Sequence, residues 1–384
     1  MLKLVRKKAI SVQRFSTSTS PRLSSYQSQL ERSIENVNRL LEVNDRLSYL
    51  LAQYVPEPAR NTFLAIRAFA LEINKITDGG RVGDHATGAL ARLHQSMGIT
   101  TADMKFKFWS EIMVKAFADA SVIGEPIAFL IRDGLRNGLN LDISYFHQYL
   151  QTRRHFVKNK QFSNVSSICS FGEGTYSQLN YATQAILLSP QISPSVIHML
   201  ELSTALQGKV SDVAAHIGQA TAVSSMILGL NFYASTRNQV TLPIELMTKH
   251  ALSQEAFLRL SQGHLTDGDE VRDTQDRLKN VIFETAIVAN DHLLSAREKL
   301  YQVKQDISAI LDLRPRDNLL SKSSKRWKRG LPDAIFVPFM VAIPTSLYLQ
   351  RLEKHDFDIN NKQLQHKEWR LAWNSFKSFY QRKI

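Results

Sequence analysis

DRLKNVIFETAIVANDHLLSAREKL, residues 276–300, is the stretch that decides the fold class of this protein. Its apolar residues recur every three or four positions, which is the spacing that places side chains on one face of an α-helix. They are Leu278, Val281, Ile282, Ala286, Ala289, Leu293, Ala296 and Leu300. The pattern predicts an amphipathic helix, and a long one.

The same periodicity predicts further helices along the chain, at residues 30–54, 57–77, 104–118, 127–135, 176–188 and 195–205. Pro58 and Pro126 each follow a glutamate at the start of one of these segments, where the first helical turn accepts proline. No strand-like alternation lasts six residues with turn signals at both ends, and no fixed-period repeat is visible. The sequence therefore predicts an all-α fold.

Composition excludes several classes of protein. With 384 residues, 43% of them hydrophobic, the chain can bury a large core, which excludes disorder over most of its length. The single cysteine, Cys169, excludes an intramolecular disulfide framework and a thiolate metal cluster within one chain. We interpret Cys169 as a small buried hydrophobe, with a reactive thiol as the alternative.

The N-terminus is basic and has no acidic residue before Glu31. Basic and apolar residues alternate there with serines, which is typical of a mitochondrial transit peptide, and RFSTSTS indicates cleavage after Phe15. A basic tail that binds nucleic acid is the alternative, but no RNP-like aromatic motif or zinc finger supports it, so we expect no nucleic-acid partner. The expected organisation is a transit peptide at 1–15, an N-terminal extension with a first helix at 16–56, and one helical domain at 57–384.

Two polar stretches interrupt the helical pattern. TDGDEVRD, residues 266–273, contains glycine and four acids, and we interpret it as a solvated loop. RPRDNLLSKSSKRWKRG, residues 314–330, carries seven basic residues and one acid, which is typical of a mobile basic loop. Anionic lipid attracts each nearby basic residue by about 1 kcal/mol, and tryptophan suits the headgroup boundary. The candidate membrane contacts are Lys322, Lys325, Arg326, Trp327, Lys328 and Arg329; a solvated charge run with no partner is the alternative.

The segment behind this loop is apolar. AIFVPFMVAIPTSLYL, residues 334–349, has sixteen residues, fewer than the roughly 20 of a spanning helix, and Pro338 and Pro344 interrupt its hydrogen bonding. We expect a kinked core helix and no transmembrane span.

The common catalytic motifs are missing from the sequence. There is no G-x-S-x-G, no G-x-G-x-x-G behind a strand, no P-loop and no H-E-x-x-H. These absences argue against a serine hydrolase, a dinucleotide-binding enzyme and a zinc enzyme. His216 lies on an alanine-rich helix, where a satisfied packing histidine is the simpler interpretation than a metal ligand.

Several segments, in this order, resemble the squalene/phytoene synthase family over roughly residue 57 to the C-terminus. They are LAIRAFALEINKITD (64–78), FKFWSEI (106–112), HIGQA (216–220), VTLP (240–243), LYLQRLEKHDFDINNKQL (347–364) and WRLAW (369–373). The resemblance implies a single helical bundle of the isoprenoid-synthase type. Within the family it is greatest to a mitochondrial branch that serves in the assembly of respiratory complex I.

Active synthases of this family hold Mg²⁺ and two prenyl diphosphates between two aspartate-rich helical motifs. Carboxylates three or four residues apart share one helix face, and they supply the hard oxygen ligands that Mg²⁺ prefers. Here Asn74 and Lys75 stand where the resemblance places the first aspartates, and Asp78 remains. Leu228 and Gly229 stand where it places an Arg-Asp pair, and no acid lies between Asp212 and Glu245.

The resemblance therefore implies a degenerate enzyme with no catalytic residue, no metal ligand set and no cofactor. Unpaired buried ions cost several kcal/mol each, and ionising a diphosphate without metal forfeits most of the electrostatic stabilisation. We expect a non-catalytic assembly factor on the matrix side of the inner membrane, whose partners are complex I subunits or assembly intermediates. A prenyltransferase or an isoprenoid- or lipid-binding protein with an unorthodox site is the alternative.

Overall fold

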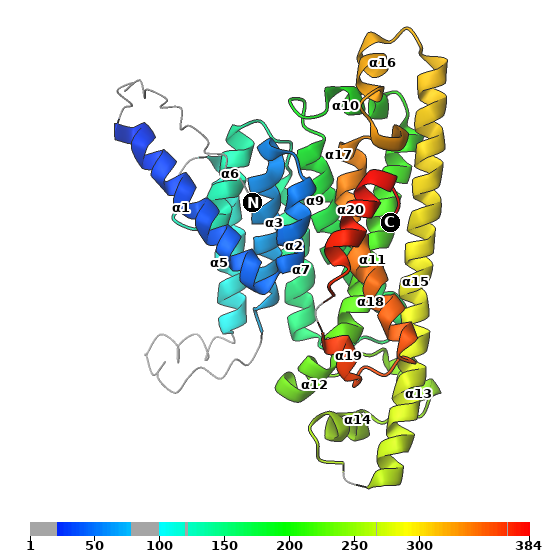
Figure 1. The fold of residues 1–384 in the computed structure, drawn as a ribbon. Coiled ribbons are helices and arrows are strands. Elements are labelled where there is room, and N and C mark those ends of the chain that lie inside the picture. The colour runs from blue at the N-terminus through cyan, green and yellow to red at the C-terminus, as the bar shows by residue number, and fades with distance from the viewer. Residues whose placement is uncertain (1–20, 78–99, 120–121, 266, 367) are drawn as a thin grey trace, which may run out of the picture.

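The computed structural model describes residues 21–77, 100–119, 122–265, 267–366 and 368–384. Over these residues the regular structure is helical, apart from one isolated β-bridge between Phe162 and Pro243. The helices pack around a single hydrophobic core, and most of them run roughly side by side in an elongated bundle (Figure 1). The prediction of an all-α fold is confirmed.

The N-terminal part of the bundle is built around α3 (Glu57–Asn74), which is buried along most of its length. Phe69 of this helix is fully buried, and its ring lies 5.1–5.7 Å from those of Trp109, Phe146 and Tyr149. Such aromatic pairs each add about 0.5–1.5 kcal/mol beyond area burial. The elements of this part are α1 (Pro21–Asn44), α2 (Arg46–Leu51), η1 (Ala52–Tyr54), α3 (Glu57–Asn74), α5 (Thr101–Ala118), α6 (Pro126–Arg136) and α7 (Ile143–Lys158).

Two helical runs approach each other closely in the middle of the chain. One is α8 (Val165–Gly172), which continues through a π-helical turn, η2 (Glu173–Ser177), into α9 (Gln178–Leu187). The other is α11 (Thr204–Leu228), preceded by α10 (Pro194–Glu201). A Cβ atom on Gly218 would lie 2.4 Å from the backbone nitrogen of Ser177, and one on Gly172 would lie 2.9 Å from the Cα of Gln219. These glycines therefore permit backbone contact between the two runs.

The longest element is α15 (Gly268–Leu313), a helix of 46 residues that packs against α11 and extends along one side of the molecule (Figure 1). Three short helices connect α11 to it: α12 (Leu230–Arg237), α13 (Ile244–Lys249) and α14 (Gln254–Ser261). The apolar residues named above for residues 276–300 are all buried. The prediction of a long amphipathic helix is confirmed.

The C-terminal elements fold back against α11 and α15. They are α16 (Asn318–Ser324), η3 (Lys328–Gly330), α17 (Asp333–Phe336), η4 (Val337–Val341), α18 (Ala342–Lys354), α19 (Lys362–Gln365) and α20 (Leu371–Gln381).

The run from α17 to α18 corrects the argument that this apolar segment is too short to cross a membrane. The helical run Asp333–Lys354 has 22 residues, so the segment is longer than the sixteen apolar residues suggested, and it is long and apolar enough to cross a membrane. The bent pair α11 and α12, which meet at 51°, meets the same test if counted as one span. Within the protein 67% of the apolar window of Asp333–Lys354 is buried, as in a core helix, and the run breaks into α17, η4 and α18 at the positions of its prolines.

Three other local predictions were wrong. Residues 30–54 form two helices and a turn because the Asp45 side chain accepts from Ser48 N and begins a new helix. Residues 266–273 are mostly the first turns of α15 and not a loop, since Asp267 caps the helix and the following acids favour its N-terminus. The basic loop likewise contains α16, which Asp317 caps.

Candidate functional site

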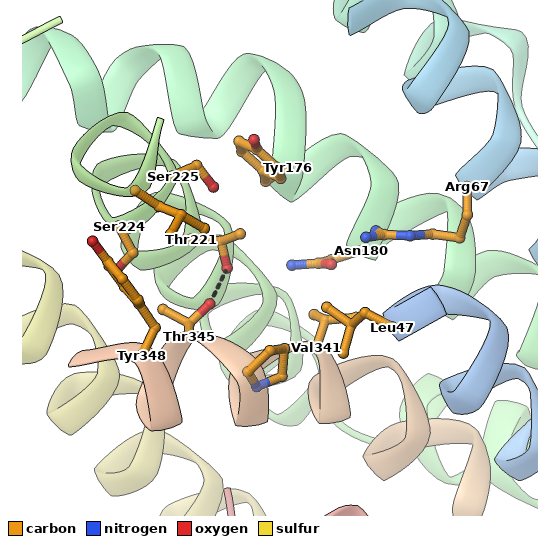
Figure 2. A pocket seen from close by; sticks show the side chains of 12 residues that line it. Leu47, Arg67, Tyr176, Asn180, Thr221, Ser224, Ser225, Val341, Thr345 and Tyr348 are labelled. Atoms are coloured by element: carbon orange, nitrogen blue, oxygen red, sulfur yellow. Dashed lines mark hydrogen bonds between the residues drawn. The ribbon is translucent and has the colours of Figure 1, made fainter. Parts of the chain in front are cut away.

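A cavity of about 140 Å³ lies at the centre of the bundle, between α3, η2, α11 and α18. Among the described residues, its polar lining consists of hydroxyl and amide groups and one arginine, with no acidic side chain. Figure 2 shows lining side chains that converge from helices far apart in the sequence. The lining residues are Leu47, Arg67, Tyr176, Asn180, Thr221, Ser224, Ser225, Leu228, Val341, Pro344, Thr345 and Tyr348.

Hydrogen bonds hold most of the polar lining in place. Thr221 donates to the carbonyl of Ile217 at 2.7 Å, and its hydroxyl lies 3.2 Å from that of Thr345. Asn180 donates to the carbonyl of Ala214 at 3.1 Å. The hydroxyl of Ser224 is buried without a hydrogen-bond partner among the described residues. Apart from Arg67, the described polar groups that line the cavity are therefore neutral.

Arg67 is the one charged side chain among the described residues of this lining. Asp45 accepts from the Ser48 hydroxyl at 2.5 Å, and the same hydroxyl accepts from Arg67 Nε at 2.8 Å. The guanidinium points from α3 toward Asn180 (Figure 2). No carboxylate of the described chain forms an ion pair with Arg67. The sequence contains a signal for this residue, a single cation inside the apolar run LAIRAFALEI, but it does not indicate the partner on α2.

The first vestigial motif lies at the C-terminal end of α3. Tyr149 donates to the Asn74 side-chain oxygen at 3.1 Å, and burial raises the pKa of the Tyr149 phenol, so it remains a neutral donor. Lys75 pairs with Glu72 at 2.6 Å and is about half exposed. Asp78 lies outside the described residues.

The second vestigial position lies at the bend between α11 and α12. Leu228 is 62% exposed and lines the rim of the central cavity. Gly229 forms the joint, and a Cβ atom there would lie 2.8 Å from the Tyr233 ring. The structure therefore brings Leu228 into the central cavity, while Asn74 and Lys75 are not part of its lining.

The described donor groups do not fit a Mg²⁺ ion. They offer one amide oxygen that already accepts a hydrogen bond, one ammonium group, an aliphatic side chain and a glycine. Mg²⁺ requires several hard oxygen ligands in near-octahedral geometry. Within the described ranges, no group of three or more histidine, cysteine, aspartate or glutamate side chains is arranged to hold a metal ion.

Two histidines and the cysteine form a cluster that the sequence did not reveal. His216 Nδ1 lies 2.9 Å from His292 Nδ1, and His292 Nε2 lies 3.4 Å from Cys169 Sγ. Burial lowers the pKa of both histidines, and the charge of His216 lowers that of His292 further, so both side chains favour the neutral form. The cluster joins α8, α11 and α15. His216 is half-buried and contacts His292, which agrees with the packing interpretation. Cys169 is half-buried, less than we expected, and burial raises the pKa of its thiol.

The basic residues of 322–329 differ in their surroundings. Four are exposed: Lys322, Lys325, Arg326 and Arg329. Trp327 is half-buried against the core, and the Lys328 ammonium lies 4.5 Å from the Phe379 ring centroid. The segment therefore packs against α20, whose exposed aromatic side chains the sequence analysis did not single out; they are Trp373, Phe376 and Tyr380.

Comparison with known proteins places the chain among helical synthases and their relatives. The sequence profile described as squalene/phytoene synthase matches residues 41–375. A Bos taurus protein named NADH dehydrogenase (ubiquinone) complex I, assembly factor 6 is 23% identical over 328 residues, 85% of this chain and 76% of its own length. A Drosophila melanogaster protein named as its homolog is 22% identical over 344 residues, 88% of this chain and 81% of its own length.

Solved structures agree on the fold. The squalene synthase HpnC from Alicyclobacillus acidocaldarius superposes with a TM-score of 0.55 at 10% identity, covering 86% of this chain and 97% of that one. A dehydrosqualene synthase in complex with ligand gives a TM-score of 0.52 at 10% identity, covering 93% of this chain and 98% of that one. At such identities the likeness concerns the fold alone.

Proposed function

The chain belongs to the squalene/phytoene synthase family, and from that premise we propose that it is a non-catalytic assembly factor for respiratory complex I. The proposal rests on the relatives named as complex I assembly factor 6 or its homolog, from cattle to fly. They match this chain over at least 85% of its length. Its partners are then complex I subunits or assembly intermediates, and the helical bundle acts as a scaffold.

The groups at the two vestigial motifs support the non-catalytic part of the proposal. A synthase must neutralise a departing diphosphate, and the groups described at these positions supply neither a metal-binding carboxylate pair nor a substitute for it. An enzyme with an unorthodox site, the alternative from the sequence, would need another source of positive charge at the same place. The central cavity offers one cation, Arg67, among its described lining residues. A single positive charge can help to bind a ligand, but it does not neutralise a departing diphosphate, which carries more than one negative charge.

Deleting the gene in an organism that has complex I is expected to deplete assembled complex I and to leave complexes III and IV largely intact. Native gels of mitochondrial membranes measure this directly. The intact chain should restore complex I, and so should the Asp78→Asn variant, because a scaffold does not need the remaining motif aspartate. Normal complex I in the deletion strain would contradict the proposal, and failure of Asp78→Asn alone would point to a working metal site.

The proposed location is the matrix side of the mitochondrial inner membrane, without a transmembrane span. The basic leader 1–15 supports import, and it lies outside the described residues. The burial of the run Asp333–Lys354 in the core supports its assignment as a core helix. N-terminal sequencing of the protein isolated from mitochondria should find a new end near residue 16, and an intact Met1 would contradict import with cleavage.

We propose that the basic segment 322–329 touches anionic lipid. Its exposed cations lie beside exposed apolar side chains, Leu313 at the end of α15 and Leu319 in α16, which are 81% and 43% exposed. The aromatic residues of α20 adjoin the segment through Lys328. Basic residues with neighbouring leucine and aromatic side chains suit the headgroup boundary of a bilayer.

Replacing Lys322, Lys325, Arg326 and Arg329 by glutamine is expected to shift the protein from the membrane to the soluble fraction. Four cations at about 1 kcal/mol each supply a few kcal/mol of salt-sensitive attachment. Lys328 stays unchanged because it packs on α20. The matched control replaces four exposed cations elsewhere: Lys105, Lys107, Lys115 and Arg272. Equal membrane association of the two variants, or resistance of the intact protein to carbonate, would refute this attachment.

A further inference from the structure

The helix α15 carries a second apolar stripe, which is exposed. Phe283, Ile287, Leu294 and Tyr301 are 44%, 40%, 50% and 58% exposed, whereas the stripe named above for residues 276–300 is buried. Single exposed apolar side chains are normal on a protein surface, but these follow a regular repeat of three and four residues, which is the heptad spacing of packed helices. We call this stripe the exposed seam; its residues are Phe283, Ile287, Asn290, Leu294, Arg297 and Tyr301.

A groove of about 180 Å³ lies between the exposed seam and α18. At one end of it, the Phe283 ring lies 5.0 Å from that of Phe357, just after α18. At the other end, Arg297 Nη2 donates to Ser346 Oγ at 3.0 Å, so the two helices run antiparallel and side by side (Figure 1). The apolar lining of the groove also includes Ala286, Ile287, Leu293 and Leu349.

This groove has the geometry that receives a third helix. Two neighbouring helices with an apolar groove between them bind the apolar face of an amphipathic helix, whose anchors recur at the same three- and four-residue intervals. From Phe283 to Tyr301 the seam measures about 27 Å at 1.5 Å per residue. A partner helix of about 18 residues therefore covers it from end to end.

Acidic side chains border the groove on both sides. Asp291 and Glu298 are exposed and lie seven residues apart, on the flank of the seam that does not line the groove. Glu353 is exposed and lines the groove from α18. None of the three forms an ion pair with a cation among the described residues. Charges at such flanking positions select the partner of a helix, so these acids favour a helix with basic flanks.

The cations near the groove do not reverse this preference. Arg297 is the one cation among the described lining residues, and it already donates to Ser346 and to the Ile384 carbonyl oxygen. Lys377 and Lys383 line the adjoining cavity, beyond Arg297 at the α20 end. A second copy of this chain fits poorly, because in an antiparallel pair of seams the acidic flank of one α15 would face that of the other.

We propose that the groove between α15 and α18 binds an amphipathic helix of a partner protein, with an apolar face of heptad spacing and basic residues on its flanks. The apolar residues of that helix cover the exposed seam, and its basic residues face Asp291, Glu298 and Glu353. The inference rests on the proposed scaffold role and names a surface for it. It can fail separately, because the test below measures binding of a synthetic peptide and not the amount of complex I.

Fluorescence anisotropy of labelled peptides with the full chain tests the groove. Each peptide is three heptads long with leucine at the first and fourth positions, and the flanks are lysine in one peptide and glutamate in the other. We expect saturable binding of the lysine peptide and about tenfold weaker binding of the glutamate peptide. A peptide with the composition of the lysine peptide in shuffled order, without an apolar face, should not bind.

The double variant Ile287→Gln/Leu294→Gln should bind the lysine peptide about tenfold more weakly, because it removes two apolar anchors from the seam. Both residues are exposed, so the fold should be unaffected. The matched control is Phe108→Gln/Val114→Gln in α5, where the two side chains are 49% and 48% exposed. This control should bind as the intact chain does.

Reversing the acidic flank provides a second test. Asp291→Lys/Glu298→Lys should reverse the preference, so that the glutamate peptide binds more tightly than the lysine peptide. Glu35→Lys/Glu42→Lys in α1, with the same spacing, exposure and change in net charge, should keep the original preference. Absence of saturable binding, equal binding of the shuffled peptide, or an unchanged affinity of Ile287→Gln/Leu294→Gln would overturn the proposal. A dimer of the intact chain in sedimentation that this variant dissociates would assign the seam to a second copy instead.

Discussion

Gly218→Val is expected to destabilise the fold severely, by about 3 kcal/mol or more, and to leave little soluble protein. The first added carbon would lie 2.1 Å from the Ser177 hydroxyl and 2.4 Å from the Ser177 backbone nitrogen. A side chain can rotate away from such a clash, but the backbone of η2 cannot move without shifting α11 or α9. The substitution therefore destabilises the fold by separating the two central helical runs where they pack most closely.

Gly208 provides a matched control within the same helix. A Cβ atom at Gly208 would meet nothing within 4 Å, so Gly208→Ala should stabilise α11 by up to about 1 kcal/mol through helix propensity. Urea or thermal unfolding followed by circular dichroism measures both effects, which have opposite signs. Gly218→Val with an unfolding midpoint close to that of the intact chain would show that α11 does not lie against η2 as described.

No Mg²⁺-dependent release of pyrophosphate from farnesyl or geranylgeranyl diphosphate is expected from the purified protein. Enzymes lower their barriers by about 8 kcal/mol or more, and in a synthase of this kind metal-neutralised charge on the leaving group is central to that gain. Asn74 is held by Tyr149, Lys75 pairs with Glu72, and Leu228 and Gly229 offer no ligand. Release should therefore equal that of a heat-killed sample.

An active synthase assayed in parallel establishes that the assay detects turnover. Pyrophosphate release above the heat-killed control would contradict the non-catalytic proposal only if this chain, and not a contaminant, produced it. The Asp78→Ala variant, purified in the same way, tests this. Turnover that Asp78→Ala abolishes would show that a metal site remains. Turnover that persists in Asp78→Ala and requires Arg67 would instead support an unorthodox site in the central cavity.

The helical class of the fold could be predicted because the apolar residues of each packed helix face recur every three or four positions in the sequence. The eight apolar positions of residues 276–300 are all buried, and so are Phe69 and Ile73 of α3 and Ile76 just after it. Helix starts were predicted less well. Asp267 and Asp317 were interpreted as parts of polar loops, whereas both are N-caps, a role in which an acidic side chain satisfies free backbone amides.

The features of the site could be predicted only where all of their residues lie in one short segment of the sequence. The lost acidic pattern around residues 74 and 228 is visible in the sequence, because helical spacing relates the positions within each motif. The hydrogen bond from Arg67 to Ser48 and the pair of His216 with His292 depend on segments far apart in the sequence. No local pattern encodes such contacts.

The 46 residues of α15 also set a length scale for the molecule. At 1.5 Å per residue the helix measures about 69 Å, more than twice the roughly 30 Å hydrocarbon thickness of a bilayer. Its sequence contains neither proline nor glycine after Gly268, so it has no obvious hinge. Two partners that contact α14 at one end and α16 at the other would be held at a nearly constant separation, with α15 as a rigid spacer between them.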